Sequence, residues 1–183
     1  MAATESQMVS LGTIAPDFNL LNTVTNSLTS LNELKSDKAT VILFICNHCP
    51  FVIHINKALS LLANKYQTKG VNFIAISSND IEKYPADAPE LMTTFALENK
   101  YSFPYLYDED QSVAKAYGAE CTPDIFVYDK DLKLAYRGRF DATRPNMGTA
   151  TGEDLAKALD SIILTNSYTE PQLPSIGCGI KWK

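Results

Sequence analysis

The 183-residue chain has no excess of basic residues. Its 16 lysines and arginines are outnumbered by 21 aspartates and glutamates, for a net charge of −5. The three arginines all fall between residues 137 and 144. Nucleic acids and anionic membranes are usually approached through a basic face. The sequence therefore predicts neither a nucleic-acid nor a membrane partner.

Long hydrophobic runs are missing as well. No apolar stretch approaches the length of about 20 residues that spans a bilayer. The first seven residues contain neither the basic nor the apolar segment of a secretory signal. We therefore expect a cytoplasmic protein, and structural disulfides are rare in that compartment.

Cysteine is scarce, with four residues at positions 46, 49, 121 and 178. Four cysteines are too few for a disulfide scaffold in a chain of this length. In a reducing compartment, the close pair Cys46 and Cys49 indicates either redox chemistry or metal binding.

The composition, 45% hydrophobic and 20% charged, is typical of a globular protein and predicts one domain over residues 1–183. Residues 151–154 resemble a capping box that opens the last helix, and the tail from about 165 to 183 reads as irregular. Alternating strands and helices followed by a hairpin predict a three-layer α/β fold with a central mixed sheet. Strands are predicted near 18–20 and 28 and at 41–45, 71–76, 105–107, 125–128 and 132–140, and helices at 51–66, 89–100, 111–117 and from 153.

The cysteine pair lies where a buried strand turns into a helix. A helix N-terminus carries a partial positive charge that stabilises a thiolate and lowers its pKa from about 8.5. Cys49 follows Cys46 by about one helical turn, and Pro50 suits the first turn of the helix. We expect the more exposed Cys46 to attack a substrate disulfide and Cys49 to resolve the mixed disulfide.

His48 stands between the two sulfurs. It can stabilise a thiolate as imidazolium or by donating a neutral N–H. Two pKa units correspond to about 2.7 kcal/mol and raise the potential of a dithiol couple by about 60 mV. The sequence thus predicts a centre less reducing than a dedicated disulfide reductase.

Several segments resemble one family. Residues 12–20 resemble the opening of redoxin-domain proteins, which include peroxiredoxins and membrane-anchored thioredoxin-like proteins, and residues 46–50 resemble their active-site turn. Residues 121–127 resemble the segment that holds a cis-proline in this superfamily. Residues 136–141 and 177–182 resemble the peroxiredoxin-like (AhpC/TSA-like) subfamily that keeps a Cys-x-x-Cys.

This resemblance implies a thioredoxin fold with an N-terminal extension and an inserted helix. It also implies a cis Thr122–Pro123 peptide that faces the cysteines and leaves nearby backbone groups free for an extended substrate. Asn47, Thr122 and Pro123 are the predicted substrate-binding residues. The strand at 41–45 lacks the buried acid that carries the proton in thioredoxin, and Thr40 is the nearest polar residue.

Three functions remain open. The first is a thiol–disulfide oxidoreductase with catalytic Cys46, His48 and Cys49, acting on a protein or small-molecule disulfide without any cofactor or metal. The second is an antioxidant thiol peroxidase. The peroxiredoxin pattern Pro-x-x-x-Thr-x-x-Cys fits neither cysteine, although Arg139 and Arg144 are candidates for the arginine that polarises the peroxide. The third is a copper or zinc chaperone with soft ligands drawn from the histidines and cysteines at 46, 48, 49, 54 and 121.

Three residues are predicted as accessories to the centre. Cys121 should lie near the pair and pack there, Cys178 is a candidate third redox thiol, and Arg139 is a candidate anion contact. We expect thioredoxin or glutathione as the reductant, and a monomer or a dimer in solution.

Overall fold

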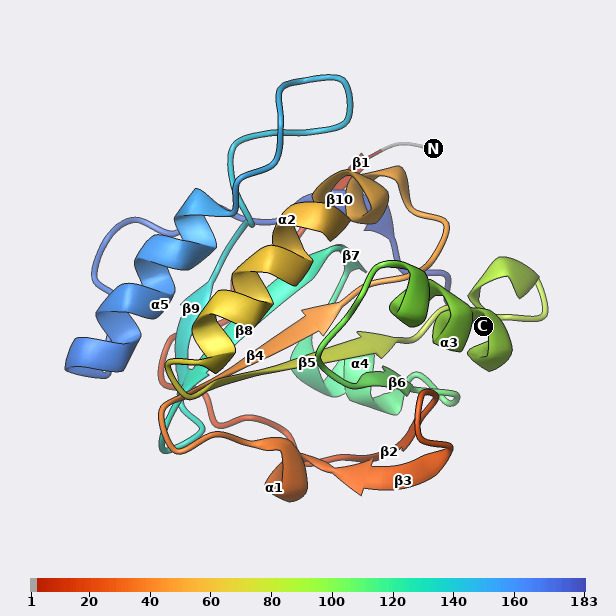
Figure 1. Cartoon of the computed structure of the whole chain (residues 1–183), viewed down its shortest axis with the longest axis horizontal. Coiled ribbons are helices and arrows are strands. Elements are labelled where there is room, and N and C mark those ends of the chain that lie inside the picture. Colours follow the sequence, from red (N-terminus) through yellow and green to blue (C-terminus); the bar gives the residue numbers. More distant parts are fainter. Residues whose placement is uncertain (1–2) are drawn as a thin grey trace.

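The computed structural model of the chain describes residues 3–183 (Figure 1). The helices are α1 (Leu31–Leu34), α2 (Pro50–Gln67), α3 (Pro89–Glu98), α4 (Ser112–Tyr117) and α5 (Glu153–Thr165), with a short 3₁₀ helix η1 (Pro85–Asp87). The strands are β1 (Ala3–Glu5), β2 (Asn19–Asn22), β3 (Ser27–Ser30), β4 (Ala39–Phe44), β5 (Val71–Ser77), β6 (Tyr105–Tyr107), β7 (Cys121–Thr122), β8 (Asp124–Asp129), β9 (Leu134–Arg137) and β10 (Ile176–Gly179).

The main sheet has seven strands in the order β3-β2-β6-β5-β4-β8-β9. Strands β4, β5 and β6 are parallel, whereas β8, β9, β2 and β3 add antiparallel pairs at the two sides. The predicted mixed sheet is therefore confirmed. All six residues of β4 are buried, as expected for a central strand that is covered on both faces.

Helices cover both faces of this sheet and complete three layers (Figure 1). Alternate residues of β4 point to opposite faces. Val41 and Leu43 pack in one core with α2, α3 and α5, and Ile42 and Phe44 pack in a second core with α1 and α4. Among residues 3–183, no helix combines the length and the apolar character needed to cross a membrane.

Helix α2 begins directly after the cysteine pair, with Cys49 as its N-cap and Pro50 as its first residue. Proline is favoured there because its missing N–H has no partner in the first turn. The predicted apolar face of α2 is buried, except at its first residue. Val52 is fully buried, whereas the predicted Phe51 is only half-buried.

The prediction of an irregular C-terminal tail is wrong at one segment. Residues 176–179 form β10, the central strand of a second sheet of order β1-β10-β7. The sequence did not predict this strand because it contains glycines at 177 and 179, and glycine is depleted in strands. The pairing partners lie far away in the chain, at its N-terminus and at β7.

The predicted capping box of α5 is also wrong. Gly152 is the N-cap, and no side chain of the segment caps the helix. The Asp141 carboxylate instead accepts hydrogen bonds from the backbone N–H groups of Thr151 (2.7 Å) and Gly152 (2.8 Å). A distant aspartate thus replaces the local cap.

Candidate active site

The turn at 46–49 meets the cis-proline segment across the end of β4. Cys46 Sγ lies 3.4 Å from Thr122 Oγ1, and Cys49 Sγ lies 3.1 Å from the Thr122 carbonyl oxygen. The Thr122–Pro123 peptide is cis, as predicted. Two segments that the sequence analysis selected independently therefore form one site.

Both sulfurs are buried, so the predicted exposure of Cys46 is wrong. Relative exposure is 1% for Cys46 and 0% for Cys49. The two residues belong to the same apolar core as Cys178 of β10. β10 lies next to the site, where it pairs with β7 at Thr122 and packs against α2.

The two thiols act as a pair that shares one proton. The hydrogen bond from Cys46 is the largest influence on Cys49 and lowers the pKa of Cys49 to about 4, although burial opposes this. The same bond raises the pKa of Cys46, and burial and the Asp87 charge raise it further. The sequence analysis treated Cys46 as the stabilised thiolate, whereas in the structure the two sulfurs titrate as a coupled pair, with one pKa lowered and the other raised.

A buried carboxylate that the sequence analysis missed lies beside this pair. Asp87, at the end of η1, is 0% exposed. Its oxygens accept hydrogen bonds from the Asn47 backbone N–H and from the Asn79 side-chain amide, each at 2.8 Å. Strand β4, which precedes the cysteines, lacks an acid. Asp87 instead comes from the connection between β5 and α3. No local motif marks it, because residues 79–88 read only as a polar loop with Pro85.

His48 is the partly exposed member of the cluster. Its Nδ1 lies 2.8 Å from Asp87 Oδ2, and its side chain is 23% exposed. The contact lacks hydrogen-bond alignment, so it is an ion pair when the imidazole is protonated. The ring stacks on Tyr84, with centroids 5.7 Å apart and planes within 4°. His48 therefore stands between Cys46 and solvent.

Asn47 holds the turn rather than a substrate. Its side-chain amide donates to the Ala86 carbonyl (2.9 Å), and its side-chain oxygen accepts from the Tyr105 hydroxyl (3.1 Å). Each polar group of this side chain therefore makes one hydrogen bond inside the protein, which fixes the orientation of the amide in the turn.

The other two cysteines lie on either side of Thr122. Cys121 contacts the Ser6 hydroxyl (3.7 Å) and the Pro123 carbonyl (3.6 Å), and burial raises its pKa. Cys178 is paired with Thr122 across the small sheet. Cys121 is thus a packing residue, whereas Cys178 is brought to the residue that both active-site sulfurs touch.

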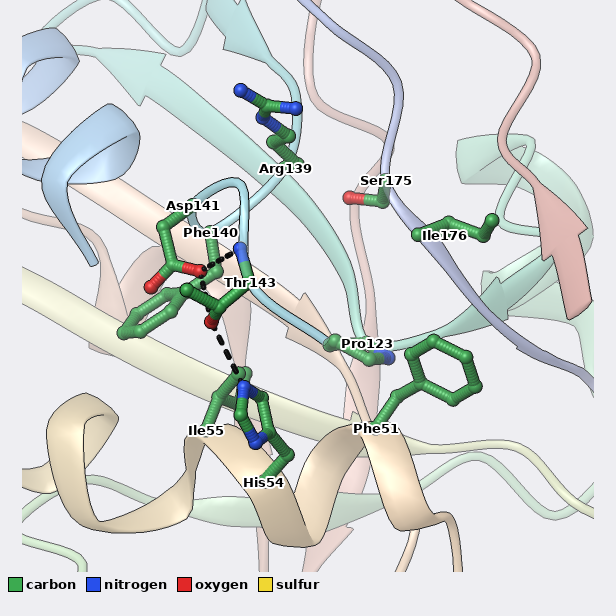
Figure 2. Close-up of a pocket in the computed structure, with 10 residues that line it drawn as sticks. All are labelled: Phe51, His54, Ile55, Pro123, Arg139, Phe140, Asp141, Thr143, Ser175 and Ile176. Carbon is green, nitrogen blue, oxygen red and sulfur yellow. Dashed lines mark hydrogen bonds between the residues drawn. The ribbon is translucent and has the colours of Figure 1, made fainter. Parts of the chain in front are cut away.

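Arg139 is directed elsewhere. Its Nε donates to Asp154 at 2.7 Å, near the start of α5. A small cavity of about 30 Å³ lies beside Pro123 and is lined by Phe51, Ile176 and other side chains. The Arg139 guanidinium points away from the proline (Figure 2). His54 also lines this cavity, and its Nε2 is hydrogen-bonded to Thr143 Oγ1 at 2.8 Å. Within residues 3–183, no arginine forms an ion pair or hydrogen bond with either active-site cysteine.

The predicted metal ligands are split by the fold. His54 and Cys121 are engaged away from the pair. Ligand atoms of Cys46, His48 and Asp87 do lie within 4.8 Å of one another, but the Asp87 oxygens already accept two hydrogen bonds. This arrangement suits charge and proton control at a thiol better than a closed tetrahedral metal site.

The shared proton predicts an unusual titration of the reduced protein. Thiolate absorbance in the ultraviolet should persist from neutral pH down toward the Cys49 pKa of about 4, far below the ordinary thiol value of about 8.5. Cys49→Ser should remove this low-pH thiolate, and Cys121→Ala should retain it. A first midpoint near that of free cysteine would contradict the shared-proton geometry.

Asp87→Asn should shift the thiol titration further toward acid. Its negative charge raises the pKa of Cys46, so removal of that charge favours ionisation. The measurement is the pH dependence of Cys46 alkylation in a Cys49→Ser background. Asp80→Asn is the matched control, because Asp80 is also buried but pairs with Lys83. Equal shifts in both variants would remove Asp87 from the site.

Comparison with known proteins identifies the fold class. An uncharacterized conserved protein from Geobacillus kaustophilus is 55% identical with a TM-score of 0.97, covering 100% of this chain and 97% of that one. A hypothetical protein from Sinorhizobium meliloti is 44% identical with a TM-score of 0.95, covering 98% of each chain. A secreted Mycobacterium tuberculosis disulfide oxidoreductase homologous to DsbE is 17% identical with a TM-score of 0.61, covering 79% of this chain and 95% of that one. The chain has the thioredoxin fold.

The family follows from the sequence match. A model of the AhpC/TSA family matches residues 11–137. The chain belongs to the AhpC/TSA family, and the predicted redoxin resemblance is confirmed. A search among curated proteins returns no match.

Proposed function

We propose that the protein is a thiol–disulfide oxidoreductase that cycles Cys46 and Cys49 between dithiol and disulfide. One observation carries the proposal: both sulfurs touch Thr122, beside a cis-proline, at the N-terminus of α2. The lowered pKa of Cys49, about 4, adds a thiolate at neutral pH. Family membership supports an oxidoreductase.

In the proposed reaction, the Cys49 thiolate accepts the Cys46 proton while Cys46 attacks a disulfide R–S–S–R′. This forms Cys46–S–S–R and releases R′S⁻. The leaving thiolate takes the proton from Cys49, giving R′SH. Cys49 then attacks the Cys46 sulfur, which releases RS⁻ and forms the Cys46–Cys49 disulfide. Two electrons thus pass from the protein to the substrate.

His48 and Asp87 control charge at the leaving group. His48 is the partly exposed group next to Cys46, so a substrate sulfur that departs from Cys46 leaves beside its ring. Asp87 is a positioning residue that holds the imidazole at 2.8 Å and the turn through the Asn47 N–H. An imidazolium at this position stabilises the leaving thiolate.

The test is equilibration of the protein with glutathione and glutathione disulfide, followed by mass mapping of cysteines. We expect a Cys46–Cys49 disulfide that forms reversibly, with a potential above that of a dedicated reductase such as thioredoxin at about −270 mV. Two free thiols at every glutathione ratio would refute the proposal. The measured potential also assigns the direction of electron flow.

A thiol peroxidase is the competing function, and one observation weighs against it. Neither of the two arginines predicted to polarise a peroxide is directed at the thiols: Arg139 pairs with Asp154, and Arg144 is exposed in the loop that precedes α5, with its backbone paired to Met147. NADPH-coupled peroxide turnover with a thioredoxin system, without protein disulfide reduction, would favour the peroxidase. The proposed partners remain a protein or small-molecule disulfide and a thioredoxin or glutathione reductant, in the cytoplasm.

A further inference from the structure

The groove beside the cis-proline is filled by the protein's own C-terminal strand. β10 pairs antiparallel with β7, with Cys178 opposite Thr122 and Gly179 opposite Cys121. These β7 residues directly precede Pro123, where an extended substrate was expected to add as a strand. The backbone positions of a bound peptide are therefore occupied by residues 176–179.

Strand β10 packs closely against β7 and is held by hydrogen bonds on both sides of the strand. A Cβ on Gly177 would lie 2.0 Å from the Thr122 carbonyl oxygen, so only glycine fits there. Before β10, the Ser175 carbonyl accepts from the Ser6 N–H (2.9 Å). After β10, the Lys181 N–H donates to the Asn79 side-chain oxygen (2.8 Å). The Asn79 side-chain amide also donates a hydrogen bond to Asp87. Because Asp87 accepts from the Asn47 N–H, Asn79 connects the C-terminal segment to the turn at 46–49.

The strand brings a third sulfur to the pair. Cys178 is opposite Thr122, which Cys49 Sγ contacts at 3.1 Å. Cys46, Cys49 and Cys178 are all buried and share one apolar core. The neighbouring Cys178 thiol favours the Cys49 thiolate, and burial, followed by the proximity of Cys49, raises the pKa of Cys178 to about 12. Strand pairing thus brings Cys178 to the Thr122 backbone that Cys49 contacts.

We propose that Cys178 is a third exchange thiol of this centre and forms a disulfide with Cys49. The inference rests on the proposed function. Starting from the Cys46–Cys49 disulfide, the Cys178 thiol gives up its proton as its sulfur attacks Cys49 Sγ. The Cys49–Cys178 bond forms, the Cys46–Cys49 bond breaks, and Cys46 leaves as a thiolate. The Cys46 thiolate takes up the proton that Cys178 lost, so charge and electrons balance without an external oxidant.

The exchange has a chemical consequence. It returns Cys46 to the reduced state while the oxidising equivalents stay in the protein. The reduced Cys46, on the side of the centre where His48 is partly exposed, is then available to react with the next thiol or disulfide. Because β10 fills the peptide groove, this arrangement favours a small-molecule partner over an extended protein segment.

A Cys46→Ser variant tests the third thiol separately from the first pair. Glutathione disulfide converts the Cys49 and Cys178 thiols into one disulfide and releases two glutathione molecules. We expect mass mapping after equilibration to find a Cys49–Cys178 bridge in most molecules, since an adjacent thiol outcompetes glutathione through its effective concentration. The double variant Cys46→Ser/Cys178→Ser should instead carry glutathione on Cys49 or remain free.

Cys121 supplies the matched control, because it is equally buried and precedes Thr122 on β7. Cys46→Ser/Cys121→Ala should form the Cys49–Cys178 bridge as Cys46→Ser does. If wild-type protein forms the Cys46–Cys49 disulfide but Cys46→Ser leaves Cys178 reduced, the third-thiol proposal is wrong and the proposed function stands. If wild-type protein forms no disulfide at all, the proposed function itself fails.

A second pair of variants tests the strand without touching a cysteine. Gly177→Ala should push β10 away from Thr122 and lower the yield of the Cys49–Cys178 bridge in the Cys46→Ser background. Gly179→Ala is the control, because its Cβ would meet the flexible Thr4 side chain at 3.2 Å and the Glu120 carbonyl at an ordinary contact distance of 3.9 Å. Equal yields in both variants would show that β10 does not deliver Cys178.

Discussion

Cys46→Ser is expected to lower the rate of disulfide exchange by about 10³-fold or more, because removal of an attacking nucleophile leaves only binding and electrostatic contributions. The serine hydroxyl can replace the thiol as a hydrogen-bond donor to Cys49, so the fold and the Cys49 thiolate should survive. The measurement is the initial rate of reduction of a small chromogenic disulfide under pseudo-first-order conditions.

Cys49→Ser separates attack from resolution. Cys46 should still attack the disulfide, but the mixed disulfide then has no resolving thiolate and accumulates as a product detectable by mass spectrometry. His54→Gln is a control, since His54 bonds Thr143 rather than the thiols. If Cys49→Ser lost the mixed disulfide and Cys46→Ser trapped it, the assignment of the two sulfurs would be reversed.

Arg137→Met is expected to destabilise the protein by about 3–5 kcal/mol, because it leaves Asp124 buried without its partner. Both side chains are 0% exposed, and Arg137 donates to Asp124 Oδ2 at 3.2 Å. The guanidinium also donates to the Gln7 and Gly118 carbonyls and lies 3.9 Å from the centre of the Phe126 ring. Urea unfolding of the reduced variants measures the loss.

Arg139→Met is the matched control two residues further along. Its ion pair with Asp154 is partly exposed on both sides, and such pairs contribute about 1 kcal/mol or less. If Arg137→Met does not fold, the double variant Arg137→Met/Asp124→Leu provides a second measurement. Removing both charges should recover part of the stability that Arg137→Met loses, because no uncompensated buried charge remains. Equal losses for Arg137→Met and Arg139→Met would show that the buried pair has no special role.

Local patterns predicted most of the elements that build the centre. The apolar run before Cys46, the proline after Cys49 and the apolar spacing to Tyr66 each depend on neighbours within a few residues. Such signals identify a central strand, a helix start and a helix face without any tertiary information. Segments 12–20, 46–50 and 121–127 were also sufficient to recognise the redoxin family and the cis-proline.

Contacts between distant segments decided the chemistry around the pair. Asp87 approaches Cys46 only because η1 folds back over the turn, and a single buried aspartate in a polar loop carries no sequence signal. The N-cap of α5 shows the same effect, since Asp141 replaces the local capping box. The burial of Cys46 was missed because Thr122 and Asp87, which lie beside its sulfur, are far from it in the chain.

The sequence by itself determined the family, and it predicted a redox centre from two cysteines one turn apart at the start of a helix. The tertiary structure alone decided that the two sulfurs are buried and coupled, which acid lies beside the histidine and which strand pairs with β7. The physical reason is range. Backbone propensity and helix polarity act over neighbouring residues, whereas desolvation and charge at a buried sulfur depend on whatever the fold packs against it.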